Sequence, residues 1–533
     1  MKIFNIKNTL FLSLFAITSL ASCSRDFTNI PSEDAIAIDN YYTTDEQVQT
    51  ATDALYFKTW FNFHNSLYYD LEVGAGNMYA YTNDAIAMNQ FNVTGNTGDV
   101  QSGWKSFWAN ISQSNFLINE LESRVGPKVS KNVVDNTIGE AYFMRATSYF
   151  YLVRLWGAVP IIENNLDYIN MPQVNTNKVD DVYTLIIKDY KKAIELLSSK
   201  NRGSSYSSNI HVSKGSAKAM LAKVYLYKKD YASTKQLAEE VINSGEFKLL
   251  GGDELPTKSF GDLFTYAGNN NEESIFALQW PADGTYGSGN SANTSLGISV
   301  SGVSTSNASY GAVFAPSQDV LTIYNTSDKR RKETFMLPGD VYPNVLAKYT
   351  SLNGNNTVTT YKPLTVPTGT LSQGSGSAIK KYCIGIASDD TGRVDGWGMM
   401  ANSTYIMRYA ELLLIHAEAV LAGGGSTSDA VALKSLNAVR NRAGLASVTS
   451  FTFDDLFKER RRELAFEGDF WFDLRRLPSA QALALLSSQN RGDLWSGVKN
   501  YSADVNDLLL PYPDNEVAKN PKLLEAPVDY QFK

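Results

Sequence analysis

Helical periodicity occurs in separate blocks along this chain, and it is lost over one long central stretch. Between about Gly245 and Asn402, Gly, Ser, Asn and Thr dominate, and apolar residues no longer recur every three or four positions. This pattern predicts a mainly α fold in which a helical scaffold carries a large, loop-rich insertion with short strands. Helices are expected over 43–60, 100–121, 133–156, 179–197, 213–227, 231–243, 405–421, 429–442 and 453–466.

Two of these blocks have the pattern of close helical pairs. In the first pair, Ala219 and Ala222 lie on one helix and Ala238 and Val241 on the next, so small residues meet where the helices touch. Residues 405–442 repeat this arrangement. Such pairs are typical of tetratricopeptide-like repeats. Because the two pairs are not contiguous in the sequence, we expect a bent α/α scaffold rather than a regular solenoid.

The N-terminus has the pattern of a lipoprotein signal peptide. Two lysines precede an apolar stretch, Leu10 to Leu20, that is too short to span a bilayer. It ends in Leu20-Ala21-Ser22-Cys23, with small residues beside the expected cleavage site and a thiol directly after it. We therefore expect residues 1–22 to be removed, Cys23 to carry lipid, and 23–40 to form a tether. An ordinary secretory signal followed by an accidental cysteine is the less favoured interpretation.

Composition excludes several classes of protein. The formal net charge of −7 argues against a nucleic-acid-binding protein, which needs a basic face. If Cys23 carries lipid, Cys383 has no partner for an intramolecular disulfide, and we expect it to be a small buried core residue. The histidines, His64, His211 and His416, lie far apart without the spacing of a zinc site. No cofactor besides the lipid is expected and no metal ligand is assigned, and whether a structural metal ion is bound in the loops stays open.

Aromatic residues are frequent in segments that do not have helical periodicity. The chain has 30 tyrosines, and many lie among Gly, Ser and Asn residues. Rigid aromatic faces on polar loops are common at binding surfaces, because they bring apolar area with little side-chain entropy to lose. Runs such as 274–278 predict short strands, and the composition of 351–377 allows disorder there. The central stretch is therefore the expected carrier of function.

Five sequence blocks, taken together and in order, resemble the SusD/RagB family of outer-membrane nutrient-binding lipoproteins. Each block alone is weak evidence, but the blocks occur in the expected order and span nearly the whole chain after the signal peptide. The blocks are EAYFMRA at 140–146 with LWGAVP at 155–160, the helix 217–227, MRYAELLLIHAEA at 407–419, ERRRELAFEG at 459–468 with FDLRR at 472–476, and LPYP at 510–513 followed by Glu516 and Asn520-Pro521.

The charged residues in these blocks are interpreted as framework. The three arginines of 459–467 could suggest an anion site, but three glutamates interleave with them at helical spacing, which favours internal ion pairing. Glu411 and Glu418 could suggest an acid/base pair, but we expect them to satisfy arginines or helix ends. No phosphate-binding loop or nucleophile elbow is present. No catalytic residue is assigned, and the chain is not expected to be an enzyme.

The resemblance implies a surface glycan-binding protein. It would capture oligosaccharides or polysaccharide at the outer membrane, facing the cell exterior, and deliver them to a SusC-like TonB-dependent transporter. A peptide- or protein-binding RagB-like lipoprotein is the alternative, and a surface glycoside hydrolase is less favoured because sequence spacing cannot set the separation of its two carboxylates. A single SusD-like domain is expected over 41–533, with the scaffold in about 41–61, 100–245 and 403–476 and ligand-binding loops in about 62–99 and 246–402.

The resemblance also directs attention to particular loop residues. Family ligand sites are built from the loops after the first helix and from the large insertion, where Tyr68 and Tyr69 also lie. For any one of these aromatics, burial in the core under a loop is an equally good interpretation. The candidate ligand-binding residues are Tyr79, Tyr81, Asn83, Asp84, Trp280, Tyr286, Tyr310 and Trp397.

Overall fold

The computed structural model describes most of the chain after residue 40. The predicted signal peptide, Cys23 and the tether lie outside the described residues. Within the described part of the chain, no helix combines the length and the apolar character needed to cross a membrane. The described residues are 41–80, 85–200, 202, 210–281, 287–296, 298, 313–353, 356–372, 375–381, 383, 400–492 and 500–532.

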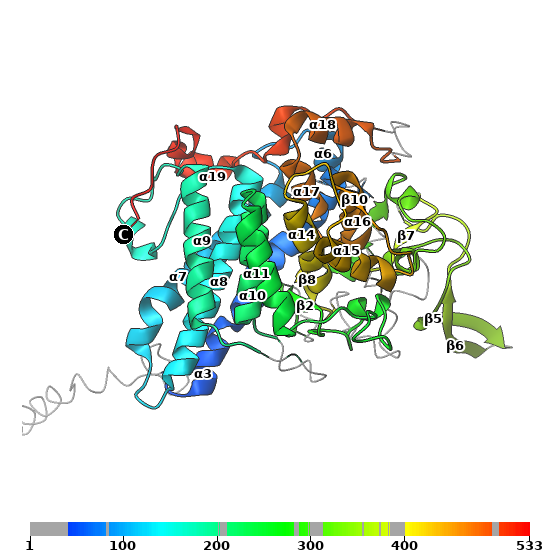
Figure 1. Ribbon diagram of the computed structural model, residues 1–533, viewed down its shortest axis with the longest axis horizontal. Helices are drawn as coiled ribbons and strands as arrows, with labels where there is room; N and C mark the ends of the chain where they lie inside the picture. Colours follow the sequence, from blue (N-terminus) through cyan, green and yellow to red (C-terminus); the bar gives the residue numbers. More distant parts are fainter. Residues whose placement is uncertain are drawn as a thin grey trace, which may run out of the picture.

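A row of helices forms the scaffold (Figure 1). Each helix packs against the one before it, and α11 packs against α14 although the whole insertion separates them in sequence. This arrangement confirms the predicted mainly α, tetratricopeptide-like scaffold. The helices are α7 (Gly98–Arg124), α8 (Lys131–Trp156), α9 (Val179–Leu196), α10 (Lys214–Tyr227), α11 (Tyr231–Ser244), α14 (Tyr409–Leu421), α15 (Ala430–Arg442) and α16 (Phe453–Leu464).

Local sequence signals set the ends of these helices. The Ser213 side chain accepts a hydrogen bond from the Ser216 backbone N–H (3.0 Å) and caps α10. Asp230 accepts from the Ser233 N–H in the same way (3.0 Å) and caps α11. Helix α8 ends at Gly157, whose φ of +77° few other residues adopt. Capping and glycine signals therefore explain why these boundaries were predicted to within a few residues.

The N-terminal part departs from the prediction in two respects. The single helix expected over 43–60 is wrong, because α-helix gives way to 3₁₀-helix after five residues. The loop expected over 62–99 contains three short helices. All eight residues of α5 are buried, so it has no amphipathic period to detect. The elements are α3 (Asp45–Gln49), η2 (Thr50–Tyr56), η3 (Lys58–Trp60), α4 (Phe61–His64), α5 (Leu67–Gly74) and α6 (Ala85–Gln90).

The insertion is built from short, mostly two-stranded ladders between longer connections. Strand β2 (Ser274–Leu278), which was predicted, pairs antiparallel with β8 (Thr404–Arg408). The helix predicted from Tyr405 is therefore wrong in its first turn, because pairing with β2 overrides a run that fits either structure. The other elements here are η6 (Gly261–Phe264), α12 (Ala292–Leu296), β3 (Phe314–Pro316), η7 (Val320–Thr322), α13 (Arg330–Thr334), β4 (Phe335–Met336) and β7 (Ala378–Ile379).

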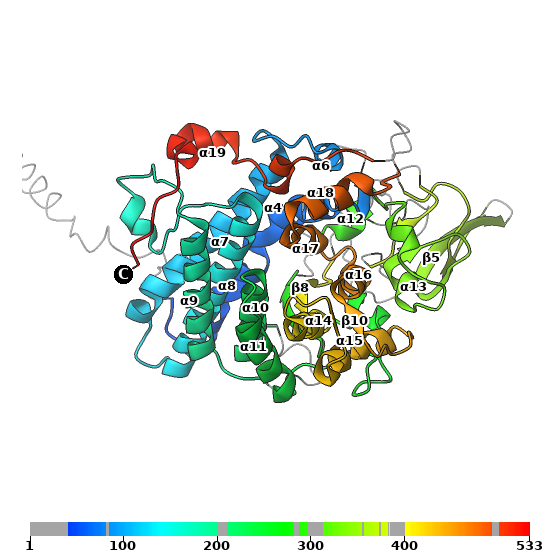
Figure 2. The same cartoon turned by 45° about the horizontal axis from the view of Figure 1, so that its top comes forward.

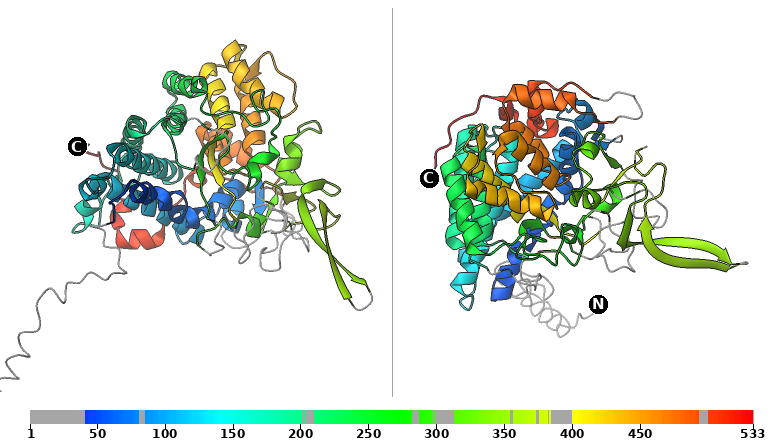
Figure 3. Two further views of the ribbon diagram at one scale, coloured as in Figure 1. Left: turned by 90° about the horizontal axis from the view of Figure 1, so that it is seen from below. Right: turned by 45° about the vertical axis from the view of Figure 1, so that its right-hand side comes forward.

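A β-hairpin projects from the insertion as an arm (Figures 1 and 3). It consists of β5 (Val341–Asn353) and β6 (Asn356–Thr365), which pair antiparallel. Disorder, which composition allowed over 351–377, is wrong for this hairpin, because Val, Thr and Tyr favour strands. Tyr342 and Leu364 at its base belong to a separate small core that also contains the buried thiol of Cys383, as predicted for that residue.

The C-terminal segments run across one end of the helix row (Figure 2). The Trp156 indole N–H donates to the Pro511 carbonyl (2.9 Å), and the Tyr512 hydroxyl donates to the Ala158 carbonyl (2.6 Å). These contacts join the end of α8 to the C-terminal block. The remaining elements are η4 (Asn165–Tyr168), β9 (Ser426–Thr427), β10 (Phe451–Thr452), α17 (Phe470–Arg476), α18 (Ser479–Ser488), η9 (Val505–Leu508), α19 (Asp514–Lys519) and η10 (Pro521–Leu524).

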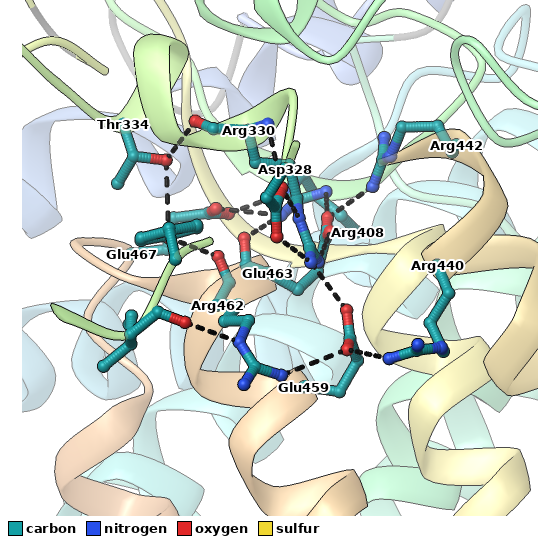
Figure 4. Close-up of polar contacts among 12 residues, drawn as sticks. Asp328, Arg330, Thr334, Arg408, Arg440, Arg442, Glu459, Arg462, Glu463 and Glu467 are labelled. Carbon is teal, nitrogen blue, oxygen red and sulfur yellow. Dashed lines mark hydrogen bonds and ion pairs between the residues drawn. The ribbon is translucent and has the colours of Figure 1, made fainter. Parts of the chain in front are cut away.

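A buried cluster of ion pairs fastens the insertion to the scaffold (Figure 4). Arg408, at the end of β8, bonds Glu463 of α16 (2.9 Å) and Glu467 (2.7 Å). Glu463 also meets Arg442 of α15 (2.5 Å) and Arg330 of the insertion (3.1 Å). Burial alone would raise the pKa of Glu463, but Arg442, Arg408 and Arg330 outweigh it and hold that pKa well below its usual range. The Glu463 carboxylate therefore joins its own helix, α16, to β8, to α15 and to the insertion at Arg330.

The framework interpretation of the charged blocks is confirmed, but the partners differ from those expected. Arg460 pairs with Glu411 (3.2 Å) and Asp473 (3.0 Å), and Arg476 pairs with Glu418. These partners lie on other helices, α14 and α17. The interleaved arginines and glutamates of α16 therefore bind mainly across helices rather than along their own.

Candidate ligand-binding site

A buried aromatic group lies where the insertion meets the N-terminal helices. His64 of α4 contacts Trp280, just after β2, with ring centroids 4.6 Å apart. His64 also contacts Tyr69 of α5 (5.3 Å), and Tyr69 contacts Phe314 of β3 (5.7 Å). These four residues, called the aromatic platform below, link helices α4 and α5 to two separate parts of the insertion.

Hydrogen bonds fix the platform in place. His64 Nε2 lies 3.0 Å from the Tyr69 hydroxyl and 2.8 Å from the Thr404 hydroxyl. The Trp280 indole N–H donates to the same Thr404 oxygen (3.0 Å). Burial lowers the pKa of His64 to about 3, so the imidazole is neutral at physiological pH. The platform is therefore an uncharged, rigid base rather than a proton-transfer site.

Two backbone pairings bring loop ends together against this platform. In the ladder of β1 (Met78–Ala80) and β3, Ala80 is the partner of Phe314. Asn290 and Met400 exchange backbone hydrogen bonds of 2.9 and 2.8 Å, and the Asn290 side chain donates to the Asn402 carbonyl (2.7 Å). Ala80 and Phe314 are thus described residues close in sequence to the predicted positions 81–84 and 310, and Asn290 and Met400 are close in sequence to 286 and 397.

The structure describes only two of the predicted ligand-contact residues. Tyr79 lies in β1 with 2% of its surface exposed, and Trp280 lies in the platform with 5% exposed. Tyr68 and Tyr69 are also buried. For these rings the alternative interpretation, a core position under a loop, fits the structure. Tyr81, Asn83, Asp84, Tyr286, Tyr310 and Trp397 lie outside the described residues and stay predictions.

A cleft of about 540 Å³ opens beside Trp280. Its walls include the rings of Tyr56, Phe57 and Tyr266, and Asp53 lies at its edge. Tyr266 is 40% exposed, so part of its side chain is accessible to a ligand. This volume is in the range of small-molecule sites. We call this feature the Tyr266 cleft. Sequence reasoning missed Tyr266, although the Gly and Asn residues that follow it fit the general pattern of tyrosines among Gly, Ser and Asn.

Most amide groups of the Tyr266 cleft are engaged within the protein. The side chains of Asn270 and Gln279 exchange two hydrogen bonds, of 2.9 and 2.7 Å. Asn269 donates to the Ala401 carbonyl (2.7 Å) and accepts from the Ser403 N–H (2.8 Å). These bonds hold the walls of the cleft, which leaves stacking on exposed rings as its main means of contact with a ligand.

His211, in the wall of the cleft, forms a structural ion pair with Glu140 of α8. His211 Nδ1 lies 2.8 Å from Glu140, and the hydroxyls of Thr52 (2.8 Å) and Tyr56 (2.9 Å) donate to the same carboxylate oxygen. Burial lowers the pKa of His211, but Glu140 outweighs burial and the net shift is upward. Across the described ranges, no three His, Cys, Asp or Glu side chains come together as metal ligands. The arrangement fixes α8 to the chain before α10.

Comparison with known proteins identifies the family. Residues 256–528 match the model described as the SusD family, and residues 34–226 match one described as starch-binding, associating with the outer membrane. A SusD-like protein of Bacteroides ovatus is 30% identical, with 98% of both chains covered. SusD-like protein P2 of Formosa agariphila is 28% identical, with 82% of both chains covered.

Solved structures agree with the sequence matches. One structure, determined with a xylogluco-oligosaccharide, has a TM-score of 0.78 at 27% identity and covers 91% of this chain and 99% of its own. A SusD superfamily protein from Parabacteroides distasonis shares the fold, with a TM-score of 0.69 at 23% identity, covering 90% of this chain and 98% of its own. On these matches, the chain belongs to the SusD family.

Proposed function

We propose that this chain is a non-catalytic glycan-binding protein of the cell surface. It captures oligosaccharides or polysaccharide and delivers them to a SusC-like TonB-dependent transporter in the outer membrane. The observation that carries the proposal is the likeness, over 91% of the chain, to a protein whose structure contains a xylogluco-oligosaccharide. That protein is similar to this one and does not fix its sugar.

The geometry of the insertion supports this proposal. The described ends of the four candidate loops are paired at Ala80 with Phe314 and at Asn290 with Met400, beside one rigid platform. The exposed ring of Tyr266 borders a cleft beside Trp280 of that platform. A sugar ring presents C–H faces that stack on such rings, and several weak contacts add up when a long ligand engages them together.

The membrane part of the proposal rests on the N-terminal sequence. Lipid on Cys23 would hold the protein at the outer membrane, with the tether of 24–40 leading to the fold. Replacing Cys23 by Ser removes the thiol that would carry the lipid, so the variant should incorporate no fatty-acid label and should keep its leader, whereas the wild type should incorporate label and be cleaved before Cys23. If the wild type incorporates no label, or if the serine variant is cleaved at the same bond, the lipoprotein assignment is wrong.

Binding to a glycan panel tests the central step. Calorimetric titration of the mature chain should give saturable binding to at least one oligosaccharide, weakened by Tyr81→Ala, Tyr310→Ala or Tyr266→Ala. Stacking contacts of this kind change affinity by about tenfold each. Tyr361→Ala is the matched control, because Tyr361 is 49% exposed but lies on the projecting arm. Its affinity should equal that of the wild type.

The same titration separates the alternatives. Release of new reducing ends from the glycan would support the glycoside hydrolase instead. Binding restricted to peptides would support a RagB-like peptide-uptake protein. Either result would replace glycan capture as the function of this chain.

A further inference from the structure

A second cleft, of about 500 Å³, is lined by residues of α17 and α18 and of the ends of α8, α9 and α10. Its lining includes Tyr183, Tyr227, Tyr231 and Phe472. None of the candidate glycan-binding loops contributes to it among the described residues. We call it the Arg475 cleft after its most unusual side chain.

Cations outnumber carboxylates in the lining of the Arg475 cleft. Arg154, Lys229, Arg475 and Arg476 contribute positive charge, whereas Glu418 is the lone carboxylate among the described lining residues. Glu418 is already bound by Arg476, at 3.0 Å between Oε2 and Nη2. A local surplus of positive charge is unusual in a chain whose net charge is −7. The surplus marks a place where an anion would be attracted.

Arg475 is the unsatisfied group. No carboxylate in the described part of the chain pairs with it, and its Nε is buried without a hydrogen-bond partner. Burial, helped by the neighbouring Arg154, lowers the pKa of Arg475 to about 10, although Tyr183 and Tyr227 oppose the shift. The Arg475 side chain is partly exposed, but its Nε is removed from water and no described carboxylate offsets that loss of hydration. A bound anion would supply the missing partner.

Arg154 is a second arginine in this cleft without a carboxylate partner among the described residues. Its guanidinium lies 3.8 Å from the ring centroid of Phe150 and 3.9 Å from that of Phe472. It donates to the Phe150 carbonyl (2.9 Å) and is 3.5 Å from the Tyr227 hydroxyl, but no described carboxylate pairs with it. Two neighbouring guanidinium groups thus lack counter-ions. Aromatic rings hold one of them rigidly in place.

These observations define the chemistry of a ligand. Guanidinium groups bind carboxylates through paired hydrogen bonds, and the aromatic walls suit a compact ring with apolar C–H faces. We propose that the Arg475 cleft binds the carboxylate of a uronic acid, at a site separate from the aromatic platform. The sugar ring in this proposal rests on the proposed glycan function, whereas the carboxylate rests on the unpaired guanidinium groups alone.

Calorimetry on the mature chain with three small probes tests this site. Glucuronate should bind saturably, whereas glucose, which lacks the carboxylate, and acetate, which lacks the ring, should bind at least about tenfold more weakly. Arg475→Gln should weaken glucuronate binding by about tenfold or more, and Arg475→Lys, which keeps charge without the planar fork, by less. Arg124→Gln, which removes an arginine of α7 paired with Glu120, is the matched control and should leave the affinity unchanged.

Thermal unfolding distinguishes a ligand site from a structural role for Arg475. Without ligand, Arg475→Gln should melt close to the temperature of the wild type, because it removes a partly exposed charge that pairs with no described carboxylate. A clearly lower melting temperature would make Arg475 a structural residue and overturn the proposal. Equal binding of acetate and glucuronate would overturn the sugar-ring part, and absence of glucuronate binding would overturn the site.

Neutral glycans measured on the same variants separate this proposal from the proposed function. Arg475→Gln should keep the affinity of the wild type for any neutral oligosaccharide that binds at the loops. Glucuronate binding without binding of any neutral glycan would contradict loop-based capture while leaving the Arg475 cleft intact. Neutral glycan binding without glucuronate binding would have the reverse meaning.

Discussion

Arg408 and Arg475 differ in both burial and surroundings: Arg408 is fully buried, whereas Arg475 is partly exposed at a cleft. Arg408 meets three carboxylates, from Glu273, Glu463 and Glu467, and lies at the junction of the insertion with the scaffold. Arg475 lines a cleft with no carboxylate partner in the described part of the chain. The two arginines come from the blocks 407–419 and 472–476, and neither block shows locally which arginine will be paired.

The difference distinguishes an arginine that holds the fold together from one that is available to a ligand. Carboxylate partners offset part of the desolvation penalty of a charge and fix its geometry, whereas a charge without such partners is offset only when a ligand binds. The cluster around Arg408 therefore explains how the insertion is held in position over the scaffold. The Arg475 cleft and the loop ends around the aromatic platform are the places where we propose that ligands bind.

Removal of the central cation should have the largest effect. Arg408→Met leaves Glu463 and Glu467 with fewer counter-ions in a buried site, so we expect the free energy of unfolding to fall by about 3–5 kcal/mol. Urea denaturation measures this change. Arg475→Met serves as the matched control and should cause no loss of stability. Similar losses in both variants would remove the distinction between the two arginines.

Removal of the shared carboxylate should have a somewhat smaller effect with a distinct pH dependence. The pKa of Glu463 is held below its usual range, so its stabilisation is present above about pH 4.5 and is lost as the pH falls through the lower, folded-state value. Glu463→Gln should destabilise the protein by about 2–4 kcal/mol at pH 7 and by much less in acid. Unfolding curves between pH 3 and 7 check this, and an equal loss at every pH would contradict it.

Glu72 is a buried carboxylate that, like Arg475, has no ion-pair partner among the described residues. It is buried, accepts hydrogen bonds from Asn77 (2.8 Å) and the Gly468 N–H (2.6 Å), and forms no ion pair with any described cation. Burial raises its pKa to about 7, so its contribution to stability is full below about pH 4.5 and declines as the pH rises towards 7. Glu72→Gln should flatten this decline, by on the order of 2 kcal/mol between pH 5 and 8. A variant with the slope of the wild type would assign the pH dependence to other groups.

The smallest effect is expected on the solvent side of the same helix as Glu463. Lys458 pairs with Asp454 (2.7 Å), and both side chains are more than half exposed. Lys458→Met should change the free energy of unfolding by less than about 0.5 kcal/mol, because exposed pairs are screened by water and salt. A loss comparable to that of Arg408→Met would mean that burial does not decide the value of these pairs.

The regular part of the fold was largely readable from the sequence. The helix predicted over 179–197 is α9 (Val179–Leu196), because apolar residues follow one face and polar residues the other. The same rule fails for α5, which is buried on every side, and for β8, whose apolar run fits either structure until β2 pairs with it. Periodicity detects elements with one buried face, and it cannot detect elements whose state depends on distant partners.

The charged framework and the site were less accessible to sequence reasoning. Internal pairing within 459–467 was expected, but the partners of Glu463 come from Arg330, Arg408 and Arg442, which no local spacing reveals. Trp280 and Tyr266 come from the same insertion, yet one is 5% exposed and the other 40% exposed. Which aromatic ring is exposed depends on packing between segments, and composition cannot decide it.

A structure of the protein with bound oligosaccharide tests the central claim, glycan capture by the insertion, most directly. The ligand would be the glycan that binds most tightly in the panel. We expect an intact oligosaccharide in contact with the loops next to Ala80, Phe314, Asn290 and Met400 or with the Tyr266 cleft. An oligosaccharide bound only to the helix row, or one found cleaved, would contradict glycan capture by the insertion.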